Sequence, residues 1–277
     1  MFGTKHTPVF FGRAADIRRA TDLWREAGSH GAPFPLTVGA SGAGKSSLAR
    51  AGLLPRLTTP DVVANVDSWR IAVMRGPATV PTVLSRRSLR RCCNGKPNLP
   101  PEKEGRGPAL PEIAEGDFKT SAPLAAVLAH ADASALAPIL NALDLVAHRT
   151  QESERYGRPV RCDLVLLVDE LDELFAASVV AETRTRFAEL RLASTGRVWI
   201  VATLRADLYA AMLDTPALKA AKNKGASYDL APPGAAERAE IARAPAAAGP
   251  AQLRTRHRPR RETRRETAAR SRPSCRP

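Results

Sequence analysis

Gly39-Ala40-Ser41-Gly42-Ala43-Gly44-Lys45-Ser46 is the most informative segment of this 277-residue chain. It follows the apolar run 34–38 and precedes a helix-like run, 47–54, so the segment predicts a strand, a glycine-rich turn and a helix. This is the G-x-x-x-x-G-K-[ST] phosphate-binding loop in the context that it requires. The glycines let successive backbone N–H groups face one anion, and the positive end of the helix dipole points at the same place.

The motif also assigns roles to side chains. Lys45 can reach the β- and γ-phosphates of a nucleotide, and the hydroxyl group of Ser46 can bind Mg²⁺. The alternative is a glycine-rich turn that matches by chance, which the flanking strand and helix disfavour. The expected nucleotide-binding residues of this loop are Gly39, Ala40, Ser41, Gly42, Ala43, Gly44, Lys45, Ser46 and Ser47.

Length and composition point to one globular body. A chain of 277 residues with 44% hydrophobic content can bury one sizeable core. The longest strongly apolar run, 164–168, is far too short to span a bilayer, and the first residues do not form a signal peptide. We expect a soluble, cytoplasmic protein with no membrane partner. Cys162 opens an apolar run, which indicates a small buried side chain.

The formal net charge of +14 is concentrated in two segments. Residues 254–276 carry ten arginines against two glutamates, and residues 86–106 carry seven basic residues against two glutamates. The rest of the chain is therefore close to neutral. A nucleic-acid-associated protein that uses its arginine tail is one hypothesis, but the tail has no aromatic residues for base stacking, so nucleic acid is not the favoured partner.

Strand and helix patterns alternate along the chain, as in a three-layer α/β fold on a parallel sheet. The strand patterns lie at 34–38, 69–74, 163–168, 198–203 and 227–230. The helix patterns lie at 17–27, at 47–54 with a stop before Pro55, at 124–130, at 136–147, around 187–192, and from 234 to a stop at Pro245.

Two segments lack such patterns. Residues 76–121 are rich in Pro, Gly, Arg and Lys, and we interpret them as a disordered insertion in a nucleotide-binding domain that spans 1–245. Residues 246–277 are interpreted as a disordered basic tail.

Four acidic residues follow the third strand pattern. Asp169 ends the apolar run 163–168, where a carboxylate can hold Mg²⁺ through water. Glu170, Asp172 and Glu173 are the candidates for the group that orients or deprotonates the attacking water. The alternative is that some of them only begin the next helix, where carboxylates favour the positive end of the dipole.

Three further residues are candidates from their position. Arg205 follows the fourth strand pattern, so it can neutralise the γ-phosphate in the crevice at the strand ends, or it can form a surface ion pair with Asp207. Gly12 and Arg13 lie in an aromatic turn before the first helix pattern. This turn either closes over the adenine side of a nucleotide or precedes a helix that merely packs on the domain.

With these residues in place, the chain resembles the STAND class of P-loop NTPases, and within it the bacterial group described as novel STAND NTPase 1. The resemblance runs from about residue 8 to residue 245 with a gap in the middle. It rests on the segments 9–13, 38–57, 169–175, 196–209 and 225–233.

The resemblance implies a nucleotide-driven switch, similar to NLR and plant resistance NTPases. Such proteins hold ADP when off, exchange it for ATP when a sensor domain is engaged, and often then form homo-oligomers. By position it implies Lys45 and Ser46 for the phosphates and Mg²⁺, and Asp169 for Mg²⁺. It also implies Asp172 or Glu173 for the water and Arg205 as the sensor of the γ-phosphate.

The chain departs from this group in three places. The residue after the first aspartate is commonly an amide, whereas here it is Glu170, and a glutamate in this place is the catalytic base in AAA+ relatives. Residues 76–110 and those after 245 do not look like the family, in which winged-helix regions and repeat arrays follow. We therefore expect sensor or effector domains to be missing, and a shifted reading frame or a truncated end is the hypothesis for both segments.

The sequence thus predicts an ATP-binding regulatory module with ATP or ADP and Mg²⁺ as cofactors. Hydrolysis should be slow, on the order of 10⁻² s⁻¹ or below. The alternatives are the nucleic-acid-associated ATPase, an inactive truncated fragment, and a metabolic P-loop kinase, for which we find neither an acceptor site nor a set of lid arginines.

Overall fold

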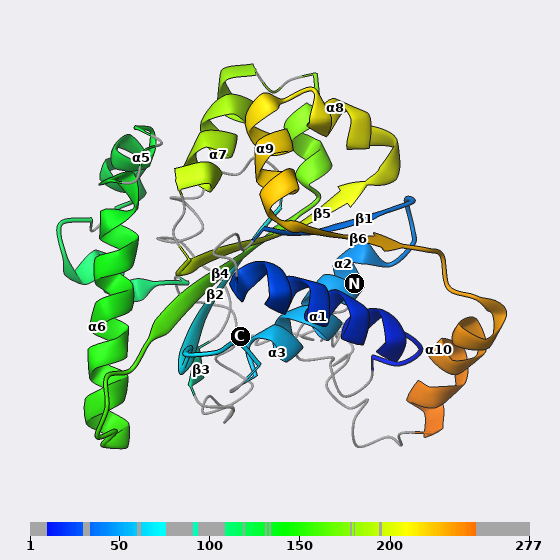
Figure 1. Cartoon of the computed structure of the whole chain (residues 1–277), viewed down its shortest axis with the longest axis horizontal. Coiled ribbons are helices and arrows are strands. Elements are labelled where there is room, and N and C mark those ends of the chain that lie inside the picture. Colours follow the sequence, from blue (N-terminus) through cyan, green and yellow to red (C-terminus); the bar gives the residue numbers. More distant parts are fainter. Residues whose placement is uncertain are drawn as a thin grey trace, which may run out of the picture.

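The structure is a computed structural model, and it describes most of the chain between residues 10 and 247 (Figure 1). The described ranges are 10–29, 34–59, 62–75, 91–93, 109–118, 120–130, 132, 134–177, 179, 181–193 and 196–247. The predicted basic tail, 246–277, lies outside these ranges except for its first two residues.

A six-stranded sheet in the order β3-β2-β4-β5-β1-β6 forms the centre of the molecule. Five of its strands are parallel, and the edge strand β3 is antiparallel to β2. The strands are β1 (Pro35–Gly39), β2 (Ser68–Arg75), β3 (Arg91–Cys93), β4 (Cys162–Asp169), β5 (Val198–Arg205) and β6 (Ala226–Leu230). The predicted three-layer α/β fold on a parallel sheet is confirmed.

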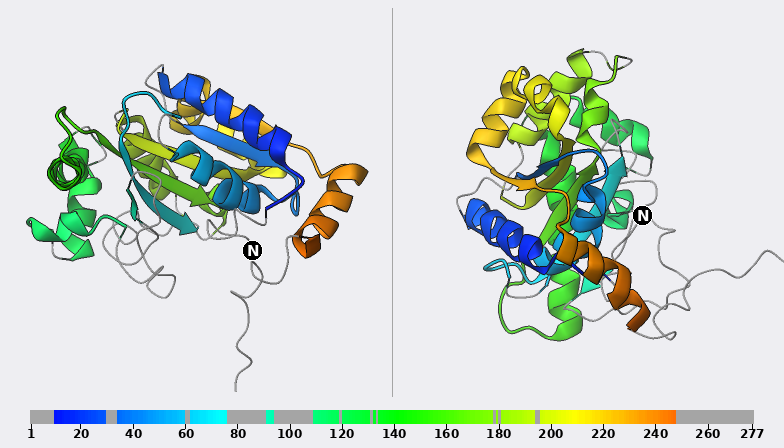
Figure 2. Two further views of the ribbon diagram at one scale, coloured as in Figure 1. Left: turned by 90° about the horizontal axis from the view of Figure 1, so that it is seen from below. Right: turned by 90° about the vertical axis from the view of Figure 1, so that its right-hand side faces the viewer.

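Helices cover both faces of this sheet (Figures 1 and 2). Before β4 they are α1 (Ala14–Ser29), α2 (Lys45–Ser47), the π-helical turn η2 (Leu48–Leu53), α3 (Leu54–Leu57), η4 (Pro111–Glu115), α5 (Ser121–Leu128), η5 (Ser134–Leu136) and α6 (Ala137–Glu154). After β4 they are η6 (Leu171–Phe175), α7 (Ala181–Ala193), η7 (Ala206–Leu208), α8 (Tyr209–Leu213) and α9 (Pro216–Lys224), whereas α10 (Ala235–Ala247) lies to the side of the sheet (Figure 1). No helix in the described ranges is long and apolar enough to cross a membrane.

Alternate residues of the strands face two separate cores, as the period of a strand requires. Leu164, Leu166 and Val168 of β4 face the core that is covered by η4, α5, α6, α8 and α9. Val165 and Leu167 face the core that is covered by α1, η2 and α3. Because β4 is buried on both faces, all of its residues from 162 to 169 are buried.

The helix after the phosphate loop continues past Pro55, contrary to the sequence prediction. Pro55 is the second residue of α3, and the π-helical turn η2 comes directly before it. At this junction the N–H of Leu54 donates to the carbonyl of Ala49, five residues earlier. A wider turn relieves the clash that a proline ring makes with the carbonyl four residues before it. The last helix likewise runs past Pro245 to Ala247.

The prediction of an irregular insertion over 76–121 is wrong in two places. Residues 91–93 form β3, and residues 109–118 contain η4, whose Glu112 and Ile113 are buried. Glu112 forms an ion pair with Arg70 of β2, and both residues are 3% exposed. This segment is held by a contact with a residue 42 positions away in the chain, so no local pattern predicts it. Residues 76–90 and 94–108 lie outside the described part of the chain.

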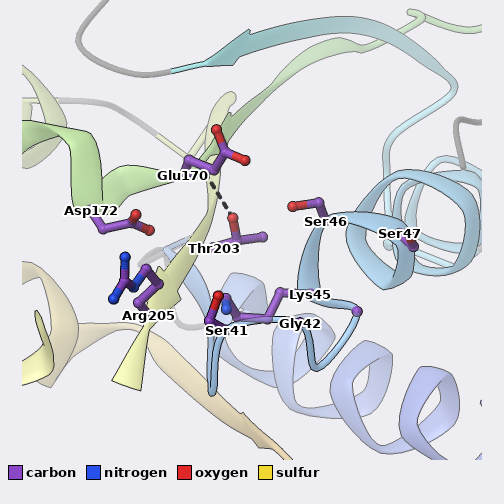
Figure 3. Close-up of a pocket in the computed structure, with 10 residues that line it drawn as sticks. Ser41, Gly42, Lys45, Ser46, Ser47, Glu170, Asp172, Thr203 and Arg205 are labelled. Atoms are coloured by element: carbon purple, nitrogen blue, oxygen red, sulfur yellow. Dashed lines mark hydrogen bonds between the residues drawn. The ribbon is translucent and has the colours of Figure 1, made fainter. Parts of the chain in front are cut away.

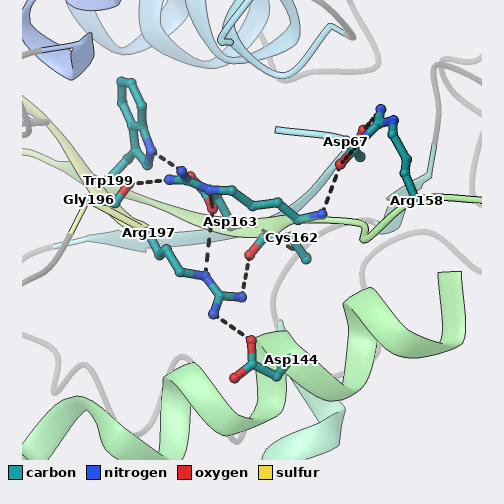
Figure 4. A network of polar contacts seen from close by, with 9 residues as sticks. Asp67, Asp144, Arg158, Cys162, Asp163, Gly196, Arg197 and Trp199 are labelled. Carbon is teal, nitrogen blue, oxygen red and sulfur yellow. Dashed lines mark hydrogen bonds and ion pairs between the residues drawn. The ribbon is translucent and has the colours of Figure 1, made fainter. Parts of the chain in front are cut away.

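A polar network joins the amino ends of β2, β4 and β5, at the edge of the sheet opposite the phosphate loop (Figure 4). Asp163 is fully buried and accepts bonds from Arg161, at 2.8 Å, and from the indole nitrogen of Trp199, at 3.2 Å. Burial raises the pKa of the Asp163 carboxyl group, and the bond from Arg161 opposes this effect. The neighbouring Cys162 is buried as predicted, and burial raises the pKa of its thiol to about 11.

Candidate functional site

The phosphate loop connects β1 to the continuous helical stretch 45–57 and turns at two glycines. Gly42 has a φ of 77° and Gly44 a φ of 91°, in the left-handed region that only glycine adopts readily. Gly44 is directly followed by the first helical residue, Lys45. The N–H groups of a first helical turn have no partners within their helix and can therefore bind an anion.

Lys45 is folded back onto the start of its own loop. Its Nζ atom donates to the carbonyl of Gly39 at 3.0 Å and to that of Ala40 at 2.9 Å, and the residue is 9% exposed. Burial lowers the pKa of Lys45, and the nearby charge of Asp172 partly opposes this effect. Two neutral carbonyls are weaker partners for an ammonium group than a phosphate is, so an incoming phosphate can displace them.

A pocket of about 390 Å³ opens beside the loop, at the carboxyl ends of β1, β4 and β5 (Figure 3). This is the place where parallel α/β sheets bind their ligands. The lining residues are Ser41, Gly42, Gly44, Lys45, Ser46, Ser47, Glu170, Asp172, Thr203 and Arg205. The structure thus brings together most of the residues that the sequence predicts for the site. The predicted residues outside this lining are Gly12, Arg13, Gly39, Ala40, Ala43, Asp169 and Glu173.

Asp169 lies behind the pocket wall and is fully buried. Its Oδ2 atom accepts a bond of 2.9 Å from Nε of Arg50, and its Oδ1 atom accepts a bond of 2.8 Å from the hydroxyl of Thr203. Both carboxylate oxygens are therefore engaged by the protein. The predicted role of Asp169, to hold Mg²⁺ through water, requires that one of these partners give way.

Two of the three candidate acids reach the pocket. Glu170 and Asp172 line it, whereas Glu173 is exposed outside the lining. All three also stand at the beginning of the 3₁₀ helix η6, with Glu170 in the position before its first residue. The two interpretations of these acids from sequence are therefore compatible for Glu170 and Asp172.

Glu170 has a φ of 65° and a ψ of 52°, a left-handed conformation that costs most residues about 1–2 kcal/mol and that asparagine adopts more readily. Its N–H donates to the hydroxyl of Thr203 at 2.9 Å, which helps to hold this conformation. We expect E170N to raise the free energy of unfolding by about 0.5–1 kcal/mol in urea denaturation. E170Q removes the same charge without the change in backbone preference, so equal stability of the two variants would contradict this explanation.

Arg205 forms the predicted surface ion pair and lies where its other predicted role, at the γ-phosphate, would require it. Its guanidinium group donates to Asp207 at 3.1 Å and 2.6 Å, which makes the surface ion pair, and the same side chain lines the pocket. The bond to Asp207 raises the pKa of Arg205. Since the pair is exposed, solvent screens it, and it does not prevent the arginine from turning to a phosphate.

Gly12 and Arg13 lie beneath the loop and not in the pocket lining. Arg13 is 6% exposed, and its guanidinium group donates to the carbonyls of Ala43, at 3.0 Å, and Ala231, at 3.1 Å. Gly12 has a φ of 78°, and a Cβ atom there would lie 2.6 Å from Ile241 of α10. The turn therefore ties the phosphate loop to the chain that leaves β6. The predicted packing of the following helix, α1, is also present, since its Trp24 is fully buried.

Two residues of the site, Thr203 and Arg50, were not predicted from the sequence. Thr203 is the polar residue near the end of β5 whose hydroxyl joins Asp169 to the backbone of Glu170. A polar residue near the end of an apolar strand pattern, next to the strand of Asp169, was the available signal. Arg50 gave no such signal, because its partner lies 119 positions away.

The residues present fit a magnesium-bound nucleotide. Asp172 has a buried Oδ1 atom with no hydrogen-bond partner in the part of the chain that the structure describes, and Ser46 and Glu170 add oxygen atoms to the same pocket. Hard oxygen donors are the ligands that Mg²⁺ prefers. The described residues contain no group of three metal-ligating side chains, so the phosphates and water would have to complete the coordination.

Comparison with known proteins adds a family match. The profile of the family described as Novel STAND NTPase 1 matches residues 1–265. No curated protein matches the chain. Among solved structures, the chain is similar to one in the "Structure of E. coli MS115-1 HORMA:CdnC:Trip13 complex", with 13% sequence identity and a TM-score of 0.39. The similarity covers 83% of this chain and 66% of that one, slightly less than two thirds of its length. A likeness this distant says nothing about ligands or partners.

Proposed function

The chain belongs to the Novel STAND NTPase 1 family, and from this premise we propose that it is an ATP-binding regulatory module that hydrolyses ATP slowly and switches between ADP-bound and ATP-bound states. The observation that supports this most is the pocket itself. In it the phosphate loop, two acids and an arginine converge from the ends of β1, β4 and β5.

The residues of the phosphate loop would bind the phosphates and Mg²⁺. The turn at Gly42 and Gly44 and the first turn of the helix would bind the phosphates through backbone N–H groups, and Lys45 would add a positive charge. Mg²⁺, when bound, would neutralise the negative charge that develops on the phosphate oxygens. Ser46 would hold this ion, together with an acid of the pocket.

The remaining side chains would act on the γ-phosphate and the water that attacks it. Asp172 has an unpartnered carboxylate oxygen within the described structure, so it is the first candidate to orient that water, with Glu170 as the second. Arg205 would leave Asp207 to neutralise the γ-phosphate. An arginine in this role is worth roughly 10³ to 10⁵ in rate in other NTPases.

The same contacts offer a route by which the nucleotide could be sensed. Arg13 donates hydrogen bonds to the carbonyl of Ala43 in the loop and to that of Ala231, which lies between β6 and α10. A movement of the loop would therefore shift the segment in which the chain leaves the sheet. A switch shifts only by as much as the γ-phosphate favours one state over the other. In this proposal the ATP-bound state forms homo-oligomers.

Phosphate release by the purified chain, with ATP and either Mg²⁺ or a chelator, tests the enzymatic part of this proposal. We expect single-turnover rates on the order of 10⁻² s⁻¹ or below with Mg²⁺, and none with the chelator. D172N should lower the rate by about 10²-fold or more, since its amide can neither accept the proton of the water nor carry a charge.

E182Q is the matched control, because Glu182 is an exposed acid of α7 that pairs only with its neighbour Arg186 among the described contacts. E170Q and E173Q rank the other two candidates for the base. Equal rates in the unmodified chain and all four variants would contradict the catalytic assignment. Phosphoryl transfer to a small molecule would favour the kinase alternative instead.

A further inference from the structure

We propose that Arg50 is a positioning residue that occupies the cation position at Asp169, so that Mg²⁺ can reach this carboxylate only by displacing it. The inference rests on the proposed function in one respect, which is that Mg²⁺ enters this site. It concerns a residue that neither the phosphate-loop motif nor the pocket lining includes.

Arg50 and Asp169 form a close ion pair. Nε and Nη2 of Arg50 lie 2.9 Å and 2.8 Å from the same oxygen, Oδ2 of Asp169. The other oxygen, Oδ1, takes its bond from the neutral hydroxyl of Thr203. Among the described residues, Arg50 is thus the only charged group in hydrogen-bond contact with this carboxylate.

Both side chains of this ion pair are largely shielded from water, which raises the cost of breaking it. The side chain of Asp169 is fully buried and that of Arg50 is 16% exposed. A buried carboxylate that loses its cation is strongly destabilised, because nothing replaces the solvation that it gave up on folding. The buried carboxylate of Asp169 is therefore stabilised by a positive charge beside it, whether from arginine or from a metal ion.

The position of Arg50 sets up the competition. It follows Ser46 by four residues in the continuous helical stretch 45–57, so the two side chains project from the same face of that stretch. Ser46 is the predicted Mg²⁺ ligand of the loop. A divalent ion shared by Ser46 and Asp169 would lie beside the guanidinium group, where like charges repel.

A functional consequence follows from this repulsion. With Arg50 in place, the negative charge of Asp169 is already balanced, so Mg²⁺ alone gains little by entering. The phosphates of a nucleotide would have to bring the charge that holds the ion. Arg50 therefore makes metal binding depend on nucleotide binding.

The test is the thermal stability of the full chain and of R50Q, measured without nucleotide in chelator and in a titration with MgCl₂ at constant ionic strength. The unmodified chain should melt at the same temperature throughout. R50Q should melt lower in chelator and recover by about 2–4 °C as Mg²⁺ takes the position beside Asp169. R50K retains the charge and should show no response to Mg²⁺.

The double variant R50Q/D169N lacks the carboxylate and should also show no response. A lower melting temperature in R50Q that Mg²⁺ does not restore would overturn the inference and leave the pair a structural contact only. Equal melting of R50Q and the unmodified chain in chelator would overturn it as well.

If R50Q does not fold, D169N carries the test through ADP binding. In D169N the charge of Arg50 is no longer neutralised, which should tighten ADP binding in chelator several-fold. Because the carboxylate is gone, Mg²⁺ should then give no further gain. Weaker ADP binding in chelator would overturn the inference. The Mg²⁺ titration of R50Q needs no nucleotide, so its result is independent of whether the chain binds ATP. A chain that fails to bind nucleotide but shows the R50Q response would refute the proposed function and retain the inference.

Discussion

The K45A variant should lose nearly all of the stabilisation that ADP or ATP gives to the unmodified chain. A ligand at about 100 times its Kd adds roughly 2.7 kcal/mol, which in a chain of this size raises the melting temperature by roughly 5–10 °C. Lys45 is the only lysine among the residues that line the pocket, and its ammonium group has only two backbone carbonyls to give up. A thermal-shift titration with ADP, ATP and Mg²⁺ measures the effect.

The same titration distinguishes a variant that folds without binding nucleotide from a variant that does not fold. Without ligand, K45A should melt cooperatively and close to the unmodified chain, because burial already disfavours the charged ammonium group, as the lowered pKa of Lys45 indicates. K219A is the matched control, since Lys219 is an exposed lysine of α9 away from the pocket. Full nucleotide stabilisation of K45A would contradict the assignment of the phosphate loop.

The second large effect is expected far from the site, at the buried ion pair between Arg70 of β2 and Glu112 of η4. R70M leaves the Glu112 carboxylate buried without its cation, and we expect a loss of about 3–5 kcal/mol in the free energy of unfolding. Urea denaturation measures this loss, and E112Q should lose a comparable amount for the converse reason.

The double variant R70M/E112M is the control, because apolar side chains of similar size often replace a buried ion pair at little or no cost. A loss below about 1 kcal/mol in R70M would mean that residues 109–118 do not pack on the sheet as described. The experiment thus tests directly the part of the insertion that the sequence pattern did not predict.

Local patterns in the sequence were enough to predict the phosphate loop, the five parallel strands and the α/β class. The reason is that each depends on residues close together in the chain. A strand buried on both faces needs an uninterrupted apolar run such as 163–168, and the loop needs glycines at positions of positive φ. The grouping of Lys45, Asp172 and Arg205 was also predictable, because the carboxyl ends of parallel strands meet at one edge.

The partners of the buried charges could not be predicted in this way. Arg50 meets Asp169 across 119 positions, Arg13 meets Ala231 across 218, and Arg70 meets Glu112 across 42. No periodicity in the chain records such pairs, since each depends on the order of the strands and on which helix faces which strand. The strand order and the packing of the helices on the sheet therefore decided which charges meet, and the pairs of Arg50 with Asp169 and of Arg70 with Glu112 form because a buried charge without a partner is costly.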